Sequence, residues 1–188
     1  MRVISGLFKG KKIWGPKDNK TRPLKDLAKE SIFNIIEHSN KFNTQLINSD
    51  ILDLFSGVGS FGIECLSRGS KKVVFVENYS GVLPILKKNL LSLKIVKNYE
   101  ILENDIYNDK VLLKLNNKFD IVFLDPPFKD KNLNEFLLKL KNFKILNKNG
   151  VIIIHRHKND NDNFSKKFKV VEEKKYGISK ISFLKNLN

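Results

Sequence analysis

The sequence is poor in the features that mark secreted, metal-bound and membrane proteins. It contains one cysteine, Cys65, so the chain cannot form an internal disulfide and has no second thiol for a zinc site. We expect Cys65 to be a buried structural thiol. No run of about eighteen uncharged apolar residues is present, and Met1 to Gly6 lack the apolar stretch of a signal peptide. These absences predict a cytoplasmic protein without a membrane span.

Acidic residues are also scarce. The chain has 20 Asp and Glu against 35 Lys and Arg, which leaves a formal net charge of +15. Such an excess makes a polyanion such as nucleic acid a candidate partner. Most of the positive charge is lysine, however, and asparagine is abundant too, a bias that genomic base composition can also produce. Scattered lysines often form only a solvated face, so composition alone leaves nucleic-acid binding open.

From residue 50 onward, apolar runs alternate with amphipathic segments. Strands are predicted over residues 51–55, 72–77, 100–103, 120–124 and 151–155, the last after a turn at Asn149-Gly150. Helices are predicted over 24–37, 60–68, 82–93, 106–115 and 133–143. Apolar strands separated by helices indicate a parallel sheet covered on both faces. Right-handed crossovers make this a doubly wound, Rossmann-like α/β fold.

The two ends of the chain have a different pattern. β-type runs over 168–173 and 178–184 flank Tyr176-Gly177 and predict an antiparallel hairpin that completes a mostly parallel, seven-stranded sheet. At the start, runs over 2–5 and 11–14 predict a small β-hairpin. We therefore divide the chain into a basic N-terminal hairpin extension, residues 1–23, and one domain, residues 24–188.

The turn after the strand at 51–55 is rich in glycine and follows an acid. It reads Asp53-Leu-Phe-Ser-Gly57-Val-Gly59-Ser-Phe-Gly62 and has the G-x-G-x-x-G spacing of dinucleotide sites. Glu77 ends the next strand, where such sites have an acid for ribose hydroxyls. In open parallel sheets, ligands bind beyond the carboxyl ends of the strands, where this turn lies. The spacing by itself favours a nicotinamide-dependent dehydrogenase, and a tight turn without any ligand is the alternative.

Electrostatics favours a different ligand. A dinucleotide places its pyrophosphate at this turn, where the Asp53 carboxylate repels it. S-adenosylmethionine has no phosphate there and presents a cationic amine and a sulfonium, while the glycines let the backbone approach its ribose and methionine parts. Asp105 ends the third strand and is expected at the adenine amino group, with Ile106 against the ring; a helix N-cap is its alternative role. The predicted cofactor residues are Asp53, Phe55, Gly57, Gly59, Glu77, Asp105 and Ile106.

The strand at 120–124 stops at Asp125-Pro-Pro-Phe128, which suits recognition of a planar amine. Proline has no N–H and a restricted φ, so Pro126 and Pro127 end the strand and keep nearby acceptors in place. If Asp125 and the Pro126 carbonyl each accept one N–H of an exocyclic amine, the nitrogen can pyramidalise toward a methyl donor. Phe128 can stack on the base; a strand-ending turn with Phe128 in the core is the alternative. These four residues are the catalytic candidates.

Together these motifs resemble a known family. Asp53-x-Phe-x-Gly57-x-Gly59 with DPPF resembles the amino-methyltransferases, whose fourth motif is [N/D]PP[Y/F/W]. The segments MRVISGLFKGKKI, TRPLKDLAKESIFNII, DILDLFSGVGSFGIECLSRGSKKVVFVE and FDIVFLDPPF are similar, in order and spacing, to the RsmD-type methyltransferases. Members of that family modify guanine N2 in small-subunit (16S) ribosomal RNA. The resemblance implies an S-adenosylmethionine-dependent enzyme that acts on this RNA within the assembling small subunit.

The resemblance also implies that the N-terminal hairpin contacts RNA through Arg2, Lys9, Lys11, Lys12 and Arg22. Basic residues gather in this segment, with Phe8 and Trp14 between them, which suits phosphate contacts and stacking. The target base must leave its stack to reach the catalytic candidates, which favours a loop or an unpaired position. A solvated hairpin whose Trp14 packs on the domain is the alternative.

The chain departs from the family at two places. Leu27 and Lys29 stand where members carry arginine in the helix after TRP, and His155-Arg156-His157 stands where they often have an acidic pair. The spacing of the two histidines is compatible with a metal ligand pair. We nevertheless expect no metal, because the sequence offers no Cys or carboxylate set to complete the site.

The residues alone leave further functions open. The same chemistry serves adenine-N6 and protein-glutamine methylation, and only the family resemblance selects guanine. A ribosome-assembly protein that binds RNA without catalysis is a second possibility, and the dehydrogenase is a third. A monomer is assumed by default.

Overall fold

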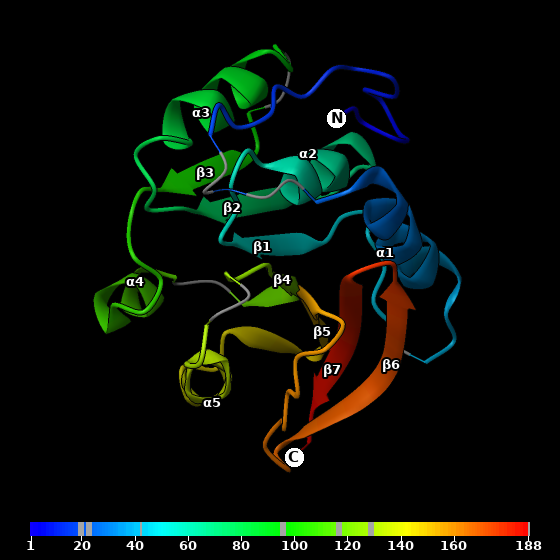
Figure 1. The fold of residues 1–188 in the computed structure, drawn as a ribbon, viewed down its shortest axis with the longest axis vertical. Helices are drawn as coiled ribbons and strands as arrows, with labels where there is room; N and C mark the ends of the chain where they lie inside the picture. The colour runs from blue at the N-terminus through cyan, green and yellow to red at the C-terminus, as the bar shows by residue number, and fades with distance from the viewer. Residues whose placement is uncertain are drawn as a thin grey trace.

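The computed structural model describes residues 1–18, 21, 24–41, 43–94, 97–115, 118–127 and 130–187. Its centre is a seven-stranded sheet in the order β3-β2-β1-β4-β5-β7-β6 (Figure 1). The strands are β1 (Asp50–Leu54), β2 (Lys72–Val76), β3 (Tyr99–Leu102), β4 (Phe119–Leu124), β5 (Leu146–His157), β6 (Phe168–Tyr176) and β7 (Ser179–Asn186). β1 to β5 pair in parallel, and β7 runs antiparallel to β5 and β6. The predicted doubly wound α/β fold and its closing hairpin are confirmed.

Helices cover both faces of this sheet. They are α1 (Asp26–His38), α2 (Ser60–Ser67), α3 (Leu83–Leu91), α4 (Asp109–Lys114) and α5 (Leu133–Asn142). In the central strands, odd-numbered residues such as Ile51 and Phe123 pack with α1, α2 and α3. Even-numbered residues such as Leu52 and Val122 pack with α4 and α5. Burial on both faces explains the continuous apolar runs. None of the described helices has the length and apolar character that crossing a membrane requires.

The strand order reverses at β1. After β1 the chain continues to β2 and β3 on one side, and it then returns to place β4 on the other side of β1. A crevice opens above the carboxyl ends of two parallel strands at such a point, because their connections leave in opposite directions. Asp53 is in register with Phe75 of β2 and Phe123 of β4. The ends of these three strands therefore meet at one edge of the sheet.

Most predicted element bounds agree with the structure to within a few residues, and two differ for local reasons. The helix predicted over 106–115 begins at residue 109, because the Asn108 side chain accepts a hydrogen bond from the Lys110 N–H (3.0 Å) and caps α4 there. The turn predicted at Asn149-Gly150 is wrong. Both residues lie within β5, in the irregular part of its pairing with β4 between Leu146 and Val151, where a glycine is common.

The N-terminal segment folds back on itself and lies over α2 and α3 (Figure 1). Backbone hydrogen bonds join Val3 to Lys11 and Ile13 to Met1, and the pairing contains a single β-bridge. Val3 and Ile13 are buried in the core cluster that α1, α2 and α3 share. The segment thus contributes side chains to the main core, and its treatment as a separate extension stays a prediction.

Glu64 of α2 anchors this segment. The residue is fully buried, and its carboxylate accepts the backbone N–H groups of Ile4 and Ser5, each at 2.8 Å. Arg68, just past the end of α2, donates from Nε to the same carboxylate at 2.9 Å. A buried charge is tolerated when it is paired and hydrogen-bonded in this way.

Lys29 of α1 is the second buried charge at this junction. It has no exposed surface, its ammonium lies 3.8 Å from Glu64, and it donates to the carbonyl of Arg2 at 2.7 Å. Burial lowers the pKa of Lys29, while Glu64 and Asp26 oppose that shift. Lys29 therefore joins α1 to the N-terminal segment inside the protein and is not available for contact with RNA.

Replacing Glu64 with alanine should lower the free energy of unfolding by about 3–5 kcal/mol, the usual cost of leaving a buried charge without its partner. Lys29 would keep an interior charge, and two backbone N–H groups would lose their acceptor. Urea denaturation measures the change. Glu37→Ala is the matched control, because Glu37 meets the same Arg68 (2.6 Å) from a more exposed position, where a pair contributes at most about 1 kcal/mol. Equal losses in both variants would contradict the anchoring role of Glu64.

Candidate active site

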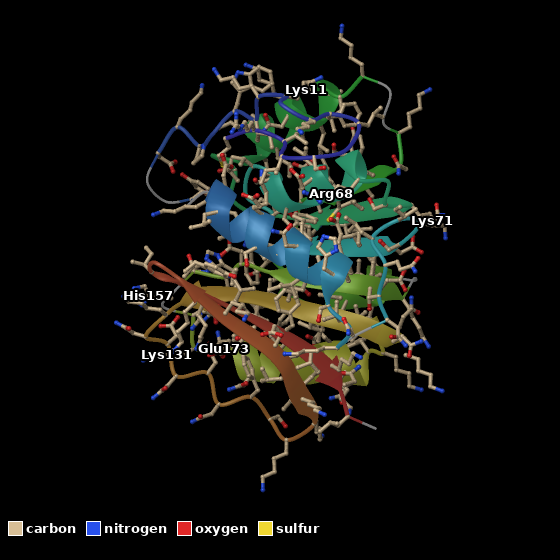
Figure 2. All side chains as sticks on the ribbon, turned by 90° about the vertical axis from the view of Figure 1, so that its right-hand side faces the viewer. Lys11, Arg68, Lys71, Lys131, His157 and Glu173 are labelled. Carbon is tan, nitrogen blue, oxygen red and sulfur yellow. The ribbon has the colours of Figure 1, made fainter. Side chains whose placement is uncertain are left out.

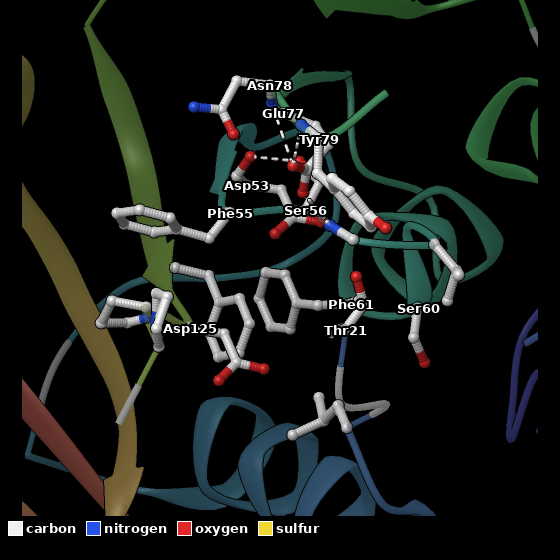
Figure 3. Close-up of a pocket in the computed structure, with 16 residues that line it drawn as sticks. Thr21, Asp53, Phe55, Ser56, Ser60, Phe61, Glu77, Asn78, Tyr79 and Asp125 are labelled. Carbon is white, nitrogen blue, oxygen red and sulfur yellow. Dashed lines mark hydrogen bonds between the residues drawn. The ribbon is translucent and has the colours of Figure 1, made fainter. Parts of the chain in front are cut away.

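Three carboxylates meet at the carboxyl edge of the sheet because they occupy odd-numbered positions at the strand ends. Asp53 lies in β1, Glu77 follows β2 and Asp125 follows β4. All three line a cavity of about 540 Å³ (Figure 3), a volume suited to a small-molecule ligand. The described lining residues are Thr21, Leu24, Asp53, Phe55, Ser56, Gly57, Val58, Ser60, Phe61, Glu77, Asn78, Tyr79, Phe123, Asp125, Pro126 and Pro127.

The described part of the cavity wall carries acidic side chains and no basic side chain. Asp53, Glu77 and Asp125 are its charged residues, and no Lys, Arg or His is among the described lining residues. The rest of that lining is mainly aromatic, aliphatic or hydroxyl-bearing. A wall of this composition attracts a cation and repels a phosphate, and the effect is strong where water is partly excluded.

Asp53 is buried, and its carboxylate contacts the first turn of helix α2. Its Oδ2 accepts the N–H of Gly62, the third residue of α2, at 3.0 Å, where the helix dipole favours negative charge. Burial raises the pKa of Asp53 well above its ordinary value, the charges of Asp125 and Glu77 add to the rise, and the Gly62 bond opposes it. The Asp53 carboxylate therefore already occupies the helix terminus at which a dinucleotide binds its phosphates.

Glu77 holds the glycine turn through the backbone. Its Oε2 accepts the N–H of Gly57 at 2.7 Å, and its Oε1 accepts those of Asn78 and Tyr79 at 2.9 and 2.8 Å (Figure 3). The Gly57 N–H, which a bound phosphate needs as a donor, is thus engaged within the protein. Each carboxylate oxygen has two lone pairs, so Glu77 still has capacity for a hydroxyl donor from a ligand.

The turn between β1 and α2 requires unusual backbone conformations. Gly57 has a φ of +55°, which glycine adopts without strain, and a Cβ there would come within 3.1 Å of the Thr21 side chain. Phe55 has a φ of +58°, an uncommon conformation for a residue with a large side chain. Its ring packs 5.8 Å from that of Tyr107. The turn thereby brings the Gly57 backbone and the Phe55 side chain to the cavity.

The segment after β4 forms another part of the cavity wall. Asp125, Pro126 and Pro127 all line it, and the strand ends before them, as the prolines predict. The Oδ1 atom of Asp125 lies 2.8 Å from Nδ1 of His155, at the far end of β5. Phe128, the fourth catalytic candidate, is outside the described residues. The structure therefore brings the described part of this motif to the same cavity as the glycine turn.

Three predicted cofactor residues are not among the cavity-lining residues. Asp105 is exposed, and its Oδ1 accepts the Tyr107 N–H at 3.0 Å. Its alternative role as a helix N-cap is wrong, since Asn108 caps α4. Ile106 is buried with α4 and α5, on the opposite face of the sheet. Gly59 lies just before α2 with a φ of +83°, a left-handed backbone conformation that favours glycine.

The predicted RNA-contacting residues that the structure describes lie together on the N-terminal segment. Arg2, Lys9 and Lys12 are exposed. Lys11, which Figure 2 labels, is partly buried. Arg22 is outside the described residues. Exposed cations on one segment are what phosphate contacts require, and their role stays a prediction.

Trp14 does not share this exposure. Its backbone N–H donates to the side chain of Asn89 in α3 at 2.9 Å, and the ammonium of Lys88 lies 4.3 Å from the centre of its ring. The ring is half-buried and packs against the core cluster of α1, α2 and α3. For Trp14, the geometry favours packing on the domain over stacking with RNA bases.

Sequence reasoning assigns no role to several residues of the candidate site. Thr21 and Tyr79 line the cavity. Thr21 opens the family-like segment TRPLKDLAKESIFNII but is not among the predicted site residues, and no local motif marks Tyr79. The sequence suggests His155 only as half of a metal site with His157, whereas the structure pairs it with Asp125. Among the described residues there is no group of three His, Cys, Asp or Glu side chains that could hold a metal. The positions of the two residues could have indicated the pair. Asp125 and His155 both have odd numbers and lie near the carboxyl ends of β4 and β5, so their side chains face the same side of the sheet.

Comparison with known proteins gives consistent results. The model of the family described as Conserved hypothetical protein 95 matches residues 1–185. The Ribosomal RNA small subunit methyltransferase D of Haemophilus influenzae is 33% identical over 179 residues, which are 95% of this chain and 90% of that protein. A solved Haemophilus influenzae structure assigned as a methylase is 32% identical, with a TM-score of 0.73 over 100% of this chain and 98% of the other. One from Escherichia coli assigned as a methyltransferase is 25% identical, with a TM-score of 0.80 over 99% and 97%.

Asp53→Asn should stabilise the ligand-free protein at neutral pH. Because the pKa of Asp53 is raised on folding, the folded state binds this proton more tightly than the unfolded state. Stability therefore falls as the pH rises from the unfolded pKa of about 4 through the higher folded value. Asparagine keeps an acceptor for the Gly62 N–H and removes this loss. The urea midpoint of the variant should exceed that of the wild type by more at pH 8 than at about pH 4.5.

The control for this measurement is Asp50→Asn in the same strand. The Asp50 carboxylate lies 3.2 Å from the ammonium of Lys71, so its removal should give no gain in stability at either pH. An Asp53→Asn variant less stable than the wild type at both pH values would contradict the account of Asp53 as a costly buried charge.

Proposed function

We propose, from the premise that this chain belongs to the RsmD-type family described as Conserved hypothetical protein 95, that it is an RNA methyltransferase. In finer terms, it transfers a methyl group from S-adenosylmethionine to the exocyclic N2 of a guanine in small-subunit ribosomal RNA. The name of the Haemophilus influenzae relative supports this class of RNA. The choice of guanine rests on the resemblance of the motifs to that family.

The observation that carries the proposal is the acidic cavity at the carboxyl edge of β1, β2 and β4. S-adenosylmethionine supplies, when bound, an electrophilic methyl group on a positively charged sulfonium. Asp53 and Glu77 attract positive charge to the cavity, and Glu77 can accept hydrogen bonds from ribose hydroxyls. Gly57 and Phe55 complete the proposed cofactor contacts. Asp105, Ile106 and Gly59 are left out of this set, because they are not among the lining residues.

The same observation argues against the dehydrogenase. A nicotinamide dinucleotide needs backbone N–H donors at the glycine turn for its pyrophosphate. Here Glu77 accepts the N–H of Gly57 and Asp53 accepts that of Gly62. Both donors are engaged by carboxylates, whose charge repels phosphate.

Asp125 and the backbone of Pro126 act on the amine to be methylated. The Asp125 carboxylate accepts one N–H of the guanine amine, and the Pro126 carbonyl accepts the other. The two bonds favour a pyramidal nitrogen whose lone pair points away from the base plane, toward the cofactor side of the cavity. Asp125 need not be a strong base, since the nitrogen becomes acidic once methylated and its proton can then pass to the carboxylate.

The RNA is proposed to be presented within the assembling small subunit, with the target base out of its stack. Arg2, Lys9, Lys11 and Lys12 are the proposed phosphate contacts. Cytoplasmic location and a monomeric state remain predictions.

The proposed function is tested by incubating the protein with methyl-labelled S-adenosylmethionine and undermethylated ribosomal RNA, both free and in partly assembled small subunits. Nucleoside analysis should find the label in N2-methylguanosine. Label found only in N6-methyladenosine or in protein would refute the substrate. Calorimetry distinguishes the enzyme from the two competing functions, because tight RNA binding without adenosyl-ligand binding favours an assembly protein, and NADH binding favours a dehydrogenase.

Asp125→Ala should abolish methyl transfer, with a loss of at least about 100-fold, and should leave the affinity for S-adenosylmethionine within about a factor of three. The reason is that Asp125 contacts the amine, whereas Asp53 and Glu77 hold the cofactor. Initial rates and calorimetry measure the two effects. Asp109→Ala, which removes a surface carboxylate paired with Lys139 on α5, is the control and should act like the wild type. A matching loss of cofactor affinity in Asp125→Ala would show that the two roles are not separate.

The double variant Lys9→Gln/Lys12→Gln should bind ribosomal RNA more weakly and with a smaller salt dependence. For every phosphate that is no longer bound, the slope of log affinity against log salt should fall by roughly one. Cofactor affinity should be unchanged. The matched control is Lys110→Gln/Lys114→Gln, two exposed lysines at α4, far from the N-terminal segment (Figure 1). An equal change in slope for both pairs would indicate diffuse attraction in place of a defined contact.

A further inference from the structure

Two side chains near the carboxyl end of β5 contact the segment Asp125-Pro126-Pro127. His155 and Arg156 are consecutive and both buried, with 7% and 6% of their surface exposed. Because neighbouring residues of a strand face opposite sides of the sheet, the two side chains reach the loop after β4 from different faces. His155 contacts the Asp125 side chain, and Arg156 contacts the backbone beyond it.

His155 connects Asp125 to β7. Its Nδ1 lies 2.8 Å from Oδ1 of Asp125, and its Nε2 lies 2.8 Å from Oγ of Ser179. An ionised carboxylate can only accept a hydrogen bond, so Nδ1 must carry the proton. In the neutral ring, Nε2 then accepts the hydroxyl proton of Ser179. The hydrogen bonds thus run from Ser179 through His155 to Asp125.

The same three residue types, with the same ring nitrogens, form the nucleophilic triad of serine hydrolases. The burial of Ser179 and His155 here excludes that use. Ser179 is only 5% exposed, and neither Ser179 nor His155 is among the described residues that line the cavity. Asp125 does line it. The end that can meet a ligand is therefore the carboxylate, and the serine is the inner support.

We propose that His155 is a positioning residue for methyl transfer, which fixes the rotation of the Asp125 carboxylate so that Oδ2 is presented to the target amine. This inference rests on the proposed function of the cavity. A carboxylate on a short side chain can turn about its last bond, and a hydrogen bond to Oδ1 restricts that rotation. Transfer requires the acceptor at a defined position relative to the methyl donor, and a displacement of about 1 Å can cost on the order of 100-fold in rate.

Arg156 secures the backbone of the same loop. Its Nη1 donates to the carbonyl of Pro127 at 3.1 Å, and its Nη2 donates to that of Asp130 at 3.0 Å. The carboxylates of Asp160 and Asp162 lie 3.2 and 3.4 Å from its Nε and balance its charge. Arg156 thus fixes the backbone at Pro127, while His155 contacts the side chain of Asp125.

The proposal is tested with two substitutions of His155 and one matched control. His155→Phe keeps a planar ring and removes the donor to Asp125, whereas the Nδ2 of His155→Asn can take the place of Nδ1. His157→Phe removes the next histidine of the same strand and parity, whose Nδ1 accepts the N–H of Asn159 at 3.3 Å. The maximal rate of transfer to ribosomal RNA, the KM for RNA, the affinity for S-adenosylmethionine and the Tm are measured for each.

His155→Phe should lower kcat by about 10- to 100-fold with little change in KM or in cofactor affinity. His155→Asn should recover most of kcat, and His157→Phe should match the wild type. A His155→Phe variant with full kcat would overturn the proposal. Losses of kcat, cofactor affinity and Tm that are equal in the Phe and Asn variants would also overturn it, since a merely structural role predicts them.

A second readout does not depend on the substrate. Histidine ring ¹⁵N spectra of the wild type should show His155 protonated at Nδ1, and in Asp125→Ala the ring should lose that tautomer preference. Protonation at Nε2 in the wild type, unaffected by Asp125→Ala, would overturn the positioning role whatever the protein methylates. If the tautomer is as expected but ribosomal RNA receives no methyl group from the wild type, the contact stands and the proposed function fails.

Discussion

The site depends on one constraint, the reversal of strand order at β1 in a sheet whose side chains alternate between two faces. The reversal opens a crevice above β1 and β4. The alternation then directs Asp53, Glu77 and Asp125 to the same side of the sheet, so that all three reach one cavity. Their mutual repulsion adds to burial in raising the pKa of Asp53. The cavity is thus costly for the protein alone and favourable for a cationic ligand.

The protein tolerates its buried carboxylates because each also accepts backbone N–H groups. Glu64 holds the N-terminal segment, Glu77 holds the glycine turn and Asp53 holds the start of α2. In each case the hydrogen bonds satisfy the charge and fix a segment that has little regular structure of its own. Glu64 and the Gly62 N–H belong to the same short helix, α2. The basic N-terminal segment is therefore tied to the helix that borders the cavity, which links the proposed RNA contact to the proposed cofactor site.

Much of the fold could be predicted from sequence because its pattern is local. Continuous apolar runs, helical spacing and the prolines after β4 indicated the sheet, most of the helices and the edge of the sheet at which the candidate site lies. The errors came where a tertiary contact overrides a local preference. Asn149-Gly150 has the composition of a turn yet continues β5, because pairing with β4 continues past it. Lys29, whose burial the sequence analysis does not address, is a further case, because Glu64 and the carbonyl of Arg2 satisfy its ammonium inside the protein.

For the site, the sequence by itself determined the chemical groups: an acid before a glycine turn, an acid at the next strand end and an acid followed by two prolines. These are short-range patterns, and each involves only the end of one strand and the residues that follow it. The tertiary structure decided which of these acids face one cavity. That outcome depends on the strand order and on the face of the sheet that each residue occupies, across positions up to 72 residues apart, the separation of Asp53 and Asp125. The pairing of Asp125 with His155 and of His155 with Ser179 was decided in the same way, because hydrogen bonds between strand ends depend on their arrangement in space, which no local pattern records.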